Sequence, residues 1–246
     1  MEQKAVTYEV QQNVATISLN RPAVKNAINS DMHRELYSAF VQANEDSDVR
    51  VIVLTGSGDA FSSGADLKSV ATEKLGDINY GDYLKETYNK LLLYMDTIQK
   101  PTVAYINGIA VGAGLSLALA CDFRIAEYDA KMGISFLKIG LVPDAGASYY
   151  LPRLVGVGKA LEMSLGEPIS AEEAYRIGLV HKIGQPDEFV QQLLTLPTTA
   201  YGLMKNVMAS SYEHTLAEVL EMEEEAQTTA GKTKEHIMAV QRFLTK

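Results

Sequence analysis

The first stretch of the chain alternates apolar and polar residues, as strands with one buried face do. Residues 6–10 and 14–20 follow this period of two and are rich in β-branched side chains. Gln12 and Asn13 lie between them, where a two-residue turn joins two strands. The pattern predicts a hairpin, which Arg21-Pro22 ends because the residue before a proline is restricted.

A helical period replaces this alternation farther along. Asn29 or Ser30 can cap a helix, since a short polar side chain accepts a hydrogen bond from an N–H group of the first turn. From there to about Glu45, Leu36, Phe40 and Val41 fall on one face. We therefore expect a helix with one apolar face.

Three later segments predict strands: residues 49–56, whose positions 51–54 are continuously apolar, residues 102–106 and residues 123–126. The first two are almost continuously apolar, which is typical of strands that are covered on both faces. Helical patterns lie between the three segments, at about 80–99 and in the small-residue run 112–121. The recurrence of strand, helix and strand predicts an α/β fold with mostly parallel pairing.

The chain has no obvious internal repeat, and no linker rich in Pro, Gly or Ser divides its first 190 residues. We therefore expect one core domain over residues 1–190 and a C-terminal helical region over 191–246. The pattern from Thr198 onward is helical throughout and includes an acidic stretch, which usually forms a solvated helix face. A helical tail after an α/β core is a candidate lid or oligomer contact.

The composition is that of an ordinary globular protein: 246 residues, 47% hydrophobic and 22% charged, with a net charge of −9. The single cysteine, Cys121, excludes a disulfide scaffold, and the first 13 residues lack the apolar stretch of an export signal. We therefore expect a cytoplasmic protein. We expect no nucleic-acid partner because basic residues are not clustered, and no membrane partner because no apolar run approaches ~20 residues.

Several familiar motifs fail in this chain. Two Gly-x-Gly turns lack the third glycine of a dinucleotide fingerprint, because Phe61 and Leu117 stand in its place. Ser116 lacks the closing glycine of a nucleophile elbow and is expected to pack inside a helix. No metal-binding spacing connects the four histidines, each of which is expected on the surface: His33, His181, His214 and His236.

Two segments rich in small residues, 61–67 and 107–114, each follow a predicted strand. Small residues let a ligand approach the main chain closely, and N–H groups at the start of a helix carry partial positive charge. Two such N–H groups directed at one oxygen atom would form an oxyanion hole. Tight packing of a helix on a strand explains the same residues equally well, so both interpretations stay open.

A third segment, residues 140–147, supplies a carboxylate in an apolar neighbourhood that includes Leu141 and Val142. Burial raises the pKa of a carboxyl group, so Asp144 is a candidate general base. The competing interpretation is a helix N-cap, since aspartate before Ala-Gly-Ala-Ser suits that role. The residues alone favour the cap.

Short motifs spread over nearly the whole chain carry a family resemblance: Leu19-Asn20-Arg21-Pro22, Lys25-Asn26-Ala27, 61–67, 100–108, Gly112-Ala113-Gly114, Ala120-Cys121-Asp122, 151–156 and Ala174-x-x-x-Gly178-Leu179-Val180. Together they resemble the crotonase, or enoyl-CoA hydratase/isomerase, superfamily. The resemblance implies a crotonase-like spiral of ββα units in two nearly perpendicular sheets. It also implies a C-terminal helical region that drives oligomerisation, as a homotrimer or as a hexamer made of two trimers.

The resemblance further implies an acyl-CoA thioester substrate whose carbonyl oxygen is held by the N–H groups of Ala65 and Ala113. It implies a set of residues that line the substrate and coenzyme A path: Lys25, Ala27, Gly64, Asp66, Leu67, Gly112 and Gly114. We expect no metal and no separate cofactor, because coenzyme A is part of the substrate and main-chain dipoles stabilise the enolate.

The chain departs from the hydratases of this family at two positions. Those enzymes carry two catalytic glutamates where this sequence has Ser116 and Phe136, and neither residue performs acid–base chemistry near neutral pH. Asp144 matches the position of a carboxylate in some family isomerases and in the aromatic dehalogenase branch. Segments 112–119 and 136–146 look most like the ring-1,2-epoxyphenylacetyl-CoA isomerase subgroup. With this context, Asp144 is favoured as a base rather than as a cap.

The expected function is that of an acyl-CoA isomerase, in fatty-acid or phenylacetate catabolism, that shifts a double bond or isomerises a ring epoxide. Asp144 would be its acid–base residue. The alternatives are an enoyl-CoA hydratase, which is a lyase, with a non-standard acid or base, and a non-catalytic acyl-CoA-binding scaffold. A decarboxylase or dehalogenase would use the same stabilised enolate. Tyr80, Tyr83 and Tyr88 either line the acyl pocket or pack in the core.

Overall fold

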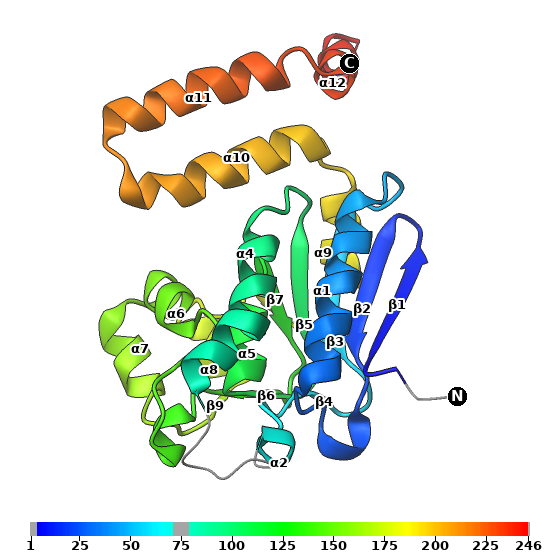
Figure 1. Ribbon diagram of the computed structural model, residues 1–246. Helices are drawn as coiled ribbons and strands as arrows, with labels where there is room; N and C mark the ends of the chain where they lie inside the picture. Colours follow the sequence, from blue (N-terminus) through cyan, green and yellow to red (C-terminus); the bar gives the residue numbers. More distant parts are fainter. Residues whose placement is uncertain (1–3, 71–78, 246) are drawn as a thin grey trace.

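The computed structural model describes residues 4–70 and 79–245, which form two β-sheets with helices packed around them (Figure 1). The larger sheet has the order β1-β2-β3-β5-β7-β10, and the smaller one has the order β4-β6-β8-β9. Figure 1 shows β6 of the smaller sheet running across one end of β5.

The strands of the larger sheet are β1 (Val6–Gln11), β2 (Val14–Leu19), β3 (Val51–Gly56), β5 (Thr102–Ile106), β7 (Phe123–Ala126) and β10 (Lys182–Ile183). The strands of the smaller sheet are β4 (Ala60–Ser62), β6 (Ile109–Val111), β8 (Lys131–Gly133) and β9 (Ile169–Ser170). The α-helices are α1 (Ser30–Glu45), α2 (Leu67–Val70), α3 (Tyr80–Leu84), α4 (Lys90–Asp96), α5 (Ala113–Leu119), α6 (Ala147–Val155), α7 (Val157–Met163), α8 (Ala171–Arg176), α9 (Asp187–Leu194), α10 (Thr198–Ser210), α11 (Leu216–Ala230) and α12 (Lys234–Leu244).

The predicted hairpin and the predicted α/β class are both confirmed. β1 and β2 pair antiparallel, and the connecting residues Gln12 and Asn13 have φ values of 48° and 65°. Positive φ at both central residues is what the twist-matched two-residue turn requires. The strands from β2 to β10 then pair in parallel, so helices must return the chain between them.

The first long helix begins where its capping residue predicts. Asn29 is the N-cap of α1, and its side chain accepts a hydrogen bond from the Met32 N–H at 3.0 Å. Leu36 and Phe40 are buried in the core, as their spacing predicts. The predicted helix at 80–99 is also present, but a π-helical turn over Lys85–Asn89 interrupts it between α3 and α4.

The small residues of α5 allow this helix to lie directly against β4. A Cβ atom placed on Gly114 would lie 2.7 Å from the Cβ of Ser62, a distance that side chains do not tolerate. All residues from Ala113 to Leu119 are buried. The close approach fixes the start of α5 beside the end of β4, and this is where the candidate site lies.

The C-terminal helices stand apart from the sheets. Figure 1 shows α10, α11 and α12 at the end of the molecule opposite to β4 and β6. Residue 190 lies inside α9, and the division into 1–190 and 191–246 stays a prediction. Within the part of the chain that the structure describes, no helix has the length and apolar character needed to cross a membrane.

Candidate active site

Three neighbouring parallel strands bring three loops to one edge of the smaller sheet. Ser62 of β4 pairs with Ala110 of β6, and Val111 of β6 pairs with Gly133 of β8. The carboxyl ends of parallel strands share one edge, which is the usual ligand position in α/β proteins. Ala65 and Ala113 follow β4 and β6 closely, and the chain after β8 reaches Asp144 through a short 3-10 helix, so the three predicted catalytic residues follow strands that end at the same edge.

The loop after β4, which carries Ala65, is hydrogen-bonded to Ile28 in the manner of a β-strand. The Ile28 N–H donates to the Gly64 carbonyl at 2.8 Å, and the Asp66 N–H donates to the Ile28 carbonyl at 2.9 Å. This is a parallel bridge between Ile28 and Ala65, in which the neighbours of Ala65 make both hydrogen bonds. The N–H group of Ala65 therefore points away from Ile28.

The second loop places another N–H group near this one. Ala113 is the first residue of α5, so its N–H has no partner within the helix. Gly112 before it has a φ of 53°, and Gly64 has a φ of 91°, a region that glycine tolerates and other residues avoid. A Cβ atom placed on Gly64 would lie 3.6 Å from the Ala113 nitrogen, so the two loops touch. The geometry suits an oxyanion hole.

The third loop carries Asp144, which does not cap a helix. Helix α6 begins at Ala147 with Gly146 in the capping position and with no side-chain capping bond. Asp144 contributes only its carbonyl, which accepts the Ala147 N–H at 3.0 Å. The capping interpretation is therefore wrong. The side-chain atom Oδ1 of Asp144 is buried and has no hydrogen-bond partner among the described residues.

Burial and backbone strain both mark this carboxylate. Burial raises the pKa of Asp144 to about 6, because the charged form loses its hydration. Ala145, the next residue, has a φ of 49°, which is costly for a residue with a Cβ atom. A general base works best when its pKa lies near the working pH, and burial gives the Asp144 carboxyl group such a pKa.

Tyr83 of α3 connects this carboxylate with the first loop. The pKa of Tyr83 is raised by burial and then by the charges of Asp144 and Asp66. The charges of both carboxylates therefore reach the Tyr83 hydroxyl and affect its pKa. Since Asp66 follows Ala65 directly, the loop of Ala65 and the loop of Asp144 face a common neighbour.

The positions of the two family glutamates are filled by residues without acid–base capacity. Ser116 is fully buried in α5, and its hydroxyl donates to the Gly112 carbonyl at 3.2 Å. Phe136 is buried in the core. The predicted packing role of Ser116 is confirmed, and among these three positions only Asp144 supplies a carboxylate.

The residues predicted to line the coenzyme path have mixed surroundings. Lys25 and Leu67 are exposed, whereas the carbonyl of buried Ala27 accepts a hydrogen bond from Arg21 at 2.6 Å. Asp66 pairs with Arg21 at 2.8 Å. Burial acts to raise the pKa of Asp66, but hydrogen bonds from Arg21 and Ser69 hold it below its ordinary value. Their contact with a coenzyme stays a prediction.

The prediction that all four histidines lie on the surface is wrong for His33. Its side chain is 5% exposed, on the buried face of α1, and its Nε2 atom lies 3.1 Å from the Tyr83 hydroxyl. The other three histidines are exposed. Within residues 4–70 and 79–245, no three His, Cys, Asp or Glu side chains are grouped as a metal site would require.

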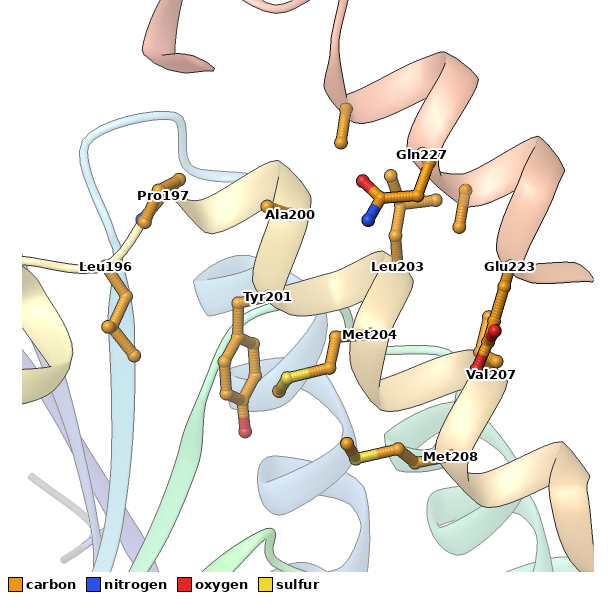
Figure 2. Close-up of a pocket in the computed structure, with 12 residues that line it drawn as sticks. Leu196, Pro197, Ala200, Tyr201, Leu203, Met204, Val207, Met208, Glu223 and Gln227 are labelled. Atoms are coloured by element: carbon orange, nitrogen blue, oxygen red, sulfur yellow. The ribbon is translucent and has the colours of Figure 1, made fainter. Parts of the chain in front are cut away.

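A cavity of about 610 Å³ lies elsewhere, between α10 and α11 (Figure 2). Its lining is mostly aliphatic and sulfur-containing, with Glu223 as its carboxylate. The lining includes Tyr201, Met204 and Met208 on α10, which Figure 2 shows on the side of that helix away from α11, and Gln227 on α11. The cavity is remote from β4 and β6, because α10 and α11 lie at the opposite end of the molecule (Figure 1).

Comparison with known proteins identifies relatives over the full length. The family model "Enoyl-CoA hydratase/isomerase" matches residues 9–246. The 1,2-epoxyphenylacetyl-CoA isomerase of Escherichia coli is 33% identical over 246 residues, which cover 96% of this chain and 94% of that one. A 4-chlorobenzoyl coenzyme A dehalogenase from Arthrobacter is 36% identical over 227 residues, which cover 89% of this chain and 82% of that one.

Solved structures of enoyl-CoA hydratases have the same fold as this chain. The crystal structure of an enoyl-CoA hydratase from Bacillus anthracis superposes with a TM-score of 0.91 at 31% identity. The match covers 98% of this chain and 96% of that one. The expected crotonase-like fold, with its helical C-terminal region, is therefore confirmed.

Proposed function

Because the chain belongs to the enoyl-CoA hydratase/isomerase family, we propose that it is an acyl-CoA isomerase that uses Asp144 as its acid–base residue. The observation that carries the proposal is the half-buried side chain of Asp144, whose Oδ1 atom is buried and has no hydrogen-bond partner among the described residues. The adjoining loops of Gly64 and Ala113, whose N–H groups are suited to hold an oxyanion, support it. The absence of carboxylates at Ser116 and Phe136 supports an isomerase over a hydratase, since hydration must also activate a water molecule.

The proposed reaction moves one proton and leaves the atom count unchanged. The Asp144 carboxylate takes a proton from C2 of a 3-enoyl thioester, and the electron pair moves onto the thioester oxygen. The N–H groups of Ala65 and Ala113 stabilise the resulting dienolate. Asp144 then returns the proton to C4, which yields the 2-enoyl thioester. No metal or redox cofactor takes part in this proposal.

Opening of a ring epoxide is the second candidate reaction. It is favoured by the relative from Escherichia coli, whose name specifies 1,2-epoxyphenylacetyl-CoA. Such an isomerisation only rearranges bonds within one molecule, so the enzyme again needs an acid–base group and an oxyanion site but no added water. The same three residues would serve this reaction.

Two substrates separate these isomerase reactions from the alternatives. We expect 3-hexenoyl-CoA to gain the absorbance of a conjugated thioester and crotonyl-CoA to keep it. Loss of that absorbance from crotonyl-CoA, with no gain from 3-hexenoyl-CoA, would identify a hydratase instead. Binding of both esters without any turnover would favour a non-catalytic scaffold.

The pH dependence of the reaction tests the role of Asp144. Only the ionised carboxylate accepts a proton, and its pKa is raised to about 6 by burial. We therefore expect kcat/KM for 3-hexenoyl-CoA to rise about tenfold per pH unit below pH 6 and to level off above it, because kcat/KM reports groups of the free enzyme. A profile that is flat between pH 4.5 and pH 7 would contradict this assignment.

A homotrimer, or a hexamer of two trimers, is the assembly that we propose. Apolar side chains on the C-terminal helices remain exposed in the single chain: Met204, Met208, Leu216, Leu220, Ile237, Met238, Phe243 and Leu244. Exposed apolar patches of this kind mark contact surfaces. Light scattering after gel filtration measures the mass directly. We also propose a cytoplasmic location, on the basis of the single cysteine.

A further inference from the structure

Three ring side chains form a cluster beside Asp144. The Tyr83 hydroxyl lies 3.1 Å from Nε2 of His33, and the rings of His33 and Tyr88 meet edge to face with centroids 4.2 Å apart. The centroids of Tyr83 and Tyr88 are 6.3 Å apart. His33 comes from α1, whereas the tyrosines come from the helical segment that includes α3, so two distant parts of the sequence build the cluster.

Unpaired polar atoms are concentrated at this place. The Tyr88 side chain is 1% exposed, yet its hydroxyl has no hydrogen-bond partner among the described residues. Nδ1 of His33 and Oδ1 of Asp144 are also buried and have no hydrogen-bond partner among the described residues. A buried polar atom without a partner costs free energy of folding, and native proteins avoid such atoms unless function requires them. Three of them in one neighbourhood indicate a site that a ligand completes.

The backbone that carries Tyr88 has an unusual shape. Tyr88 lies in the π-helical turn of residues 85–89, and such turns are rare and often occur at functional sites. Leu92 lies one turn further along α4 and contacts the loop of Asp144, because a Cβ atom on Gly146 would lie 3.3 Å from Cδ1 of Leu92. Residues four apart share a helix face, so Tyr88 lies on the side of this helical segment that faces the loop of Asp144.

We propose that the Tyr88 hydroxyl recognises the acyl group of the substrate, by donating a hydrogen bond to an uncharged oxygen atom that this group carries. The substrate class is therefore an acyl-CoA with a hydroxyl, oxo or epoxide oxygen on its acyl part. This inference rests on the proposed function, since it places Tyr88 in the acyl site of which Asp144 is the base.

The charges around the cluster favour a neutral oxygen over a carboxylate. Burial lowers the pKa of His33 to about 4, so its imidazole is neutral near pH 7. Burial, Tyr83 and Asp144 raise the pKa of Tyr88, so its hydroxyl stays protonated and remains a donor. Above pH 6 the Asp144 carboxylate, whose charge acts on Tyr88, is mostly ionised and repels an anionic acyl group.

Removal of the hydroxyl alone tests the inference. We compare the Kd of 2-hydroxyphenylacetyl-CoA with that of phenylacetyl-CoA, and of 3-hydroxybutyryl-CoA with that of butyryl-CoA, by calorimetry. In at least one pair, the unmodified protein should bind the ester with the additional oxygen atom about threefold to tenfold more tightly than the ester without it, which is the effect of one hydrogen bond. Tyr88→Phe should reduce that ratio to about one, because its ring remains and only the donor is lost.

Tyr8→Phe is the matched control, because the Tyr8 hydroxyl is also buried without a partner among the described residues but belongs to β1. Both variants should keep or raise the thermal midpoint, and only Tyr88→Phe should change the binding ratio. Equal binding within both pairs by the unmodified protein, or a ratio that survives Tyr88→Phe, would overturn the inference.

The proposed function fails by a different result. If Asp144→Asn retains full turnover of 3-hexenoyl-CoA, Asp144 is not the base, whatever the binding ratios are. If Asp144→Asn loses turnover while Tyr88→Phe leaves the ratios unchanged, the proposed function stands and the recognition role of Tyr88 is wrong.

Discussion

Replacing Asp144 with asparagine should lower kcat for double-bond migration by about two to four orders of magnitude, the usual contribution of a general base. Asparagine has nearly the same shape but cannot take a proton from C2. Neither Ser116 nor Phe136 can replace it, since the first is buried in α5 and the second is apolar. Turnover of 3-hexenoyl-CoA, followed by the absorbance of the conjugated product, measures the effect. The KM should change little.

The same substitution should make the protein more stable at neutral pH. The pKa of Asp144 is about 6 in the folded chain, above its value in the unfolded chain, so the folded state holds its proton more tightly. Stability therefore falls as pH rises from about 4 to about 6, and the cost of the buried charge is complete above that range. Asp144→Asn removes this cost.

Thermal unfolding at pH 5 and pH 7.5 checks the sign. The midpoint of Asp144→Asn should exceed that of the unmodified protein by more at pH 7.5 than at pH 5. Asp129→Asn is the control, because Asp129 is an exposed residue between β7 and β8 and should show no such difference. A variant that is both fully active and less stable would show that Asp144 is a structural residue.

Replacing Ala113 with proline should lower kcat/KM by about a hundredfold to a thousandfold, the typical value of one oxyanion donor. Proline lacks the N–H group that Ala113 would offer to the thioester oxygen. Proline is well tolerated at the first position of a helix, because the N–H there has no partner within the helix. Ala113 occupies this position in α5, so the substitution removes the donor with little cost to the helix.

Lys234→Pro provides the matched control. Lys234 is the first residue of α12, is exposed and lies in the C-terminal helical region. We expect its activity to equal that of the unmodified protein. Circular dichroism of both variants should report the same helix content. If Ala113→Pro folds and keeps full activity, the Ala113 N–H does not stabilise the enolate.

Local signals in the sequence were sufficient to predict the main helices and strands of the fold. Asn29 marks the start of α1, the two-residue turn at 12–13 sets the hairpin, and apolar runs mark β3 and β5. Each of these depends on neighbouring residues. The π-helical turn has no comparable signal in the sequence, and its residue Tyr88 packs on His33 of α1, which lies 55 positions away along the chain.

The candidate site was predictable only in part, because its residues come together through contacts between distant parts of the sequence. Asp144 before Ala-Gly-Ala-Ser satisfies the pattern of an N-cap, and only the start of α6 at Ala147 excludes it. His33 did carry a signal, since it precedes Leu36 by three residues and Phe40 by seven and so falls on the buried face of α1. Its contact with Tyr83 joins residues 50 positions apart, which periodicity does not report.

The bridge between Ile28 and the loop of Ala65 has a consequence for the dynamics of catalysis. A loop fixed on both sides of Ala65 holds its amide in one direction before any substrate arrives, so the oxyanion role that we propose for this amide would require little reorganisation of the protein. Solvent hydrogen should then exchange rapidly at the Ala65 amide and slowly at the amides of Ile28 and Asp66. Neighbouring residues of one short loop would thus differ sharply in protection, with the reactive amide as the unprotected one.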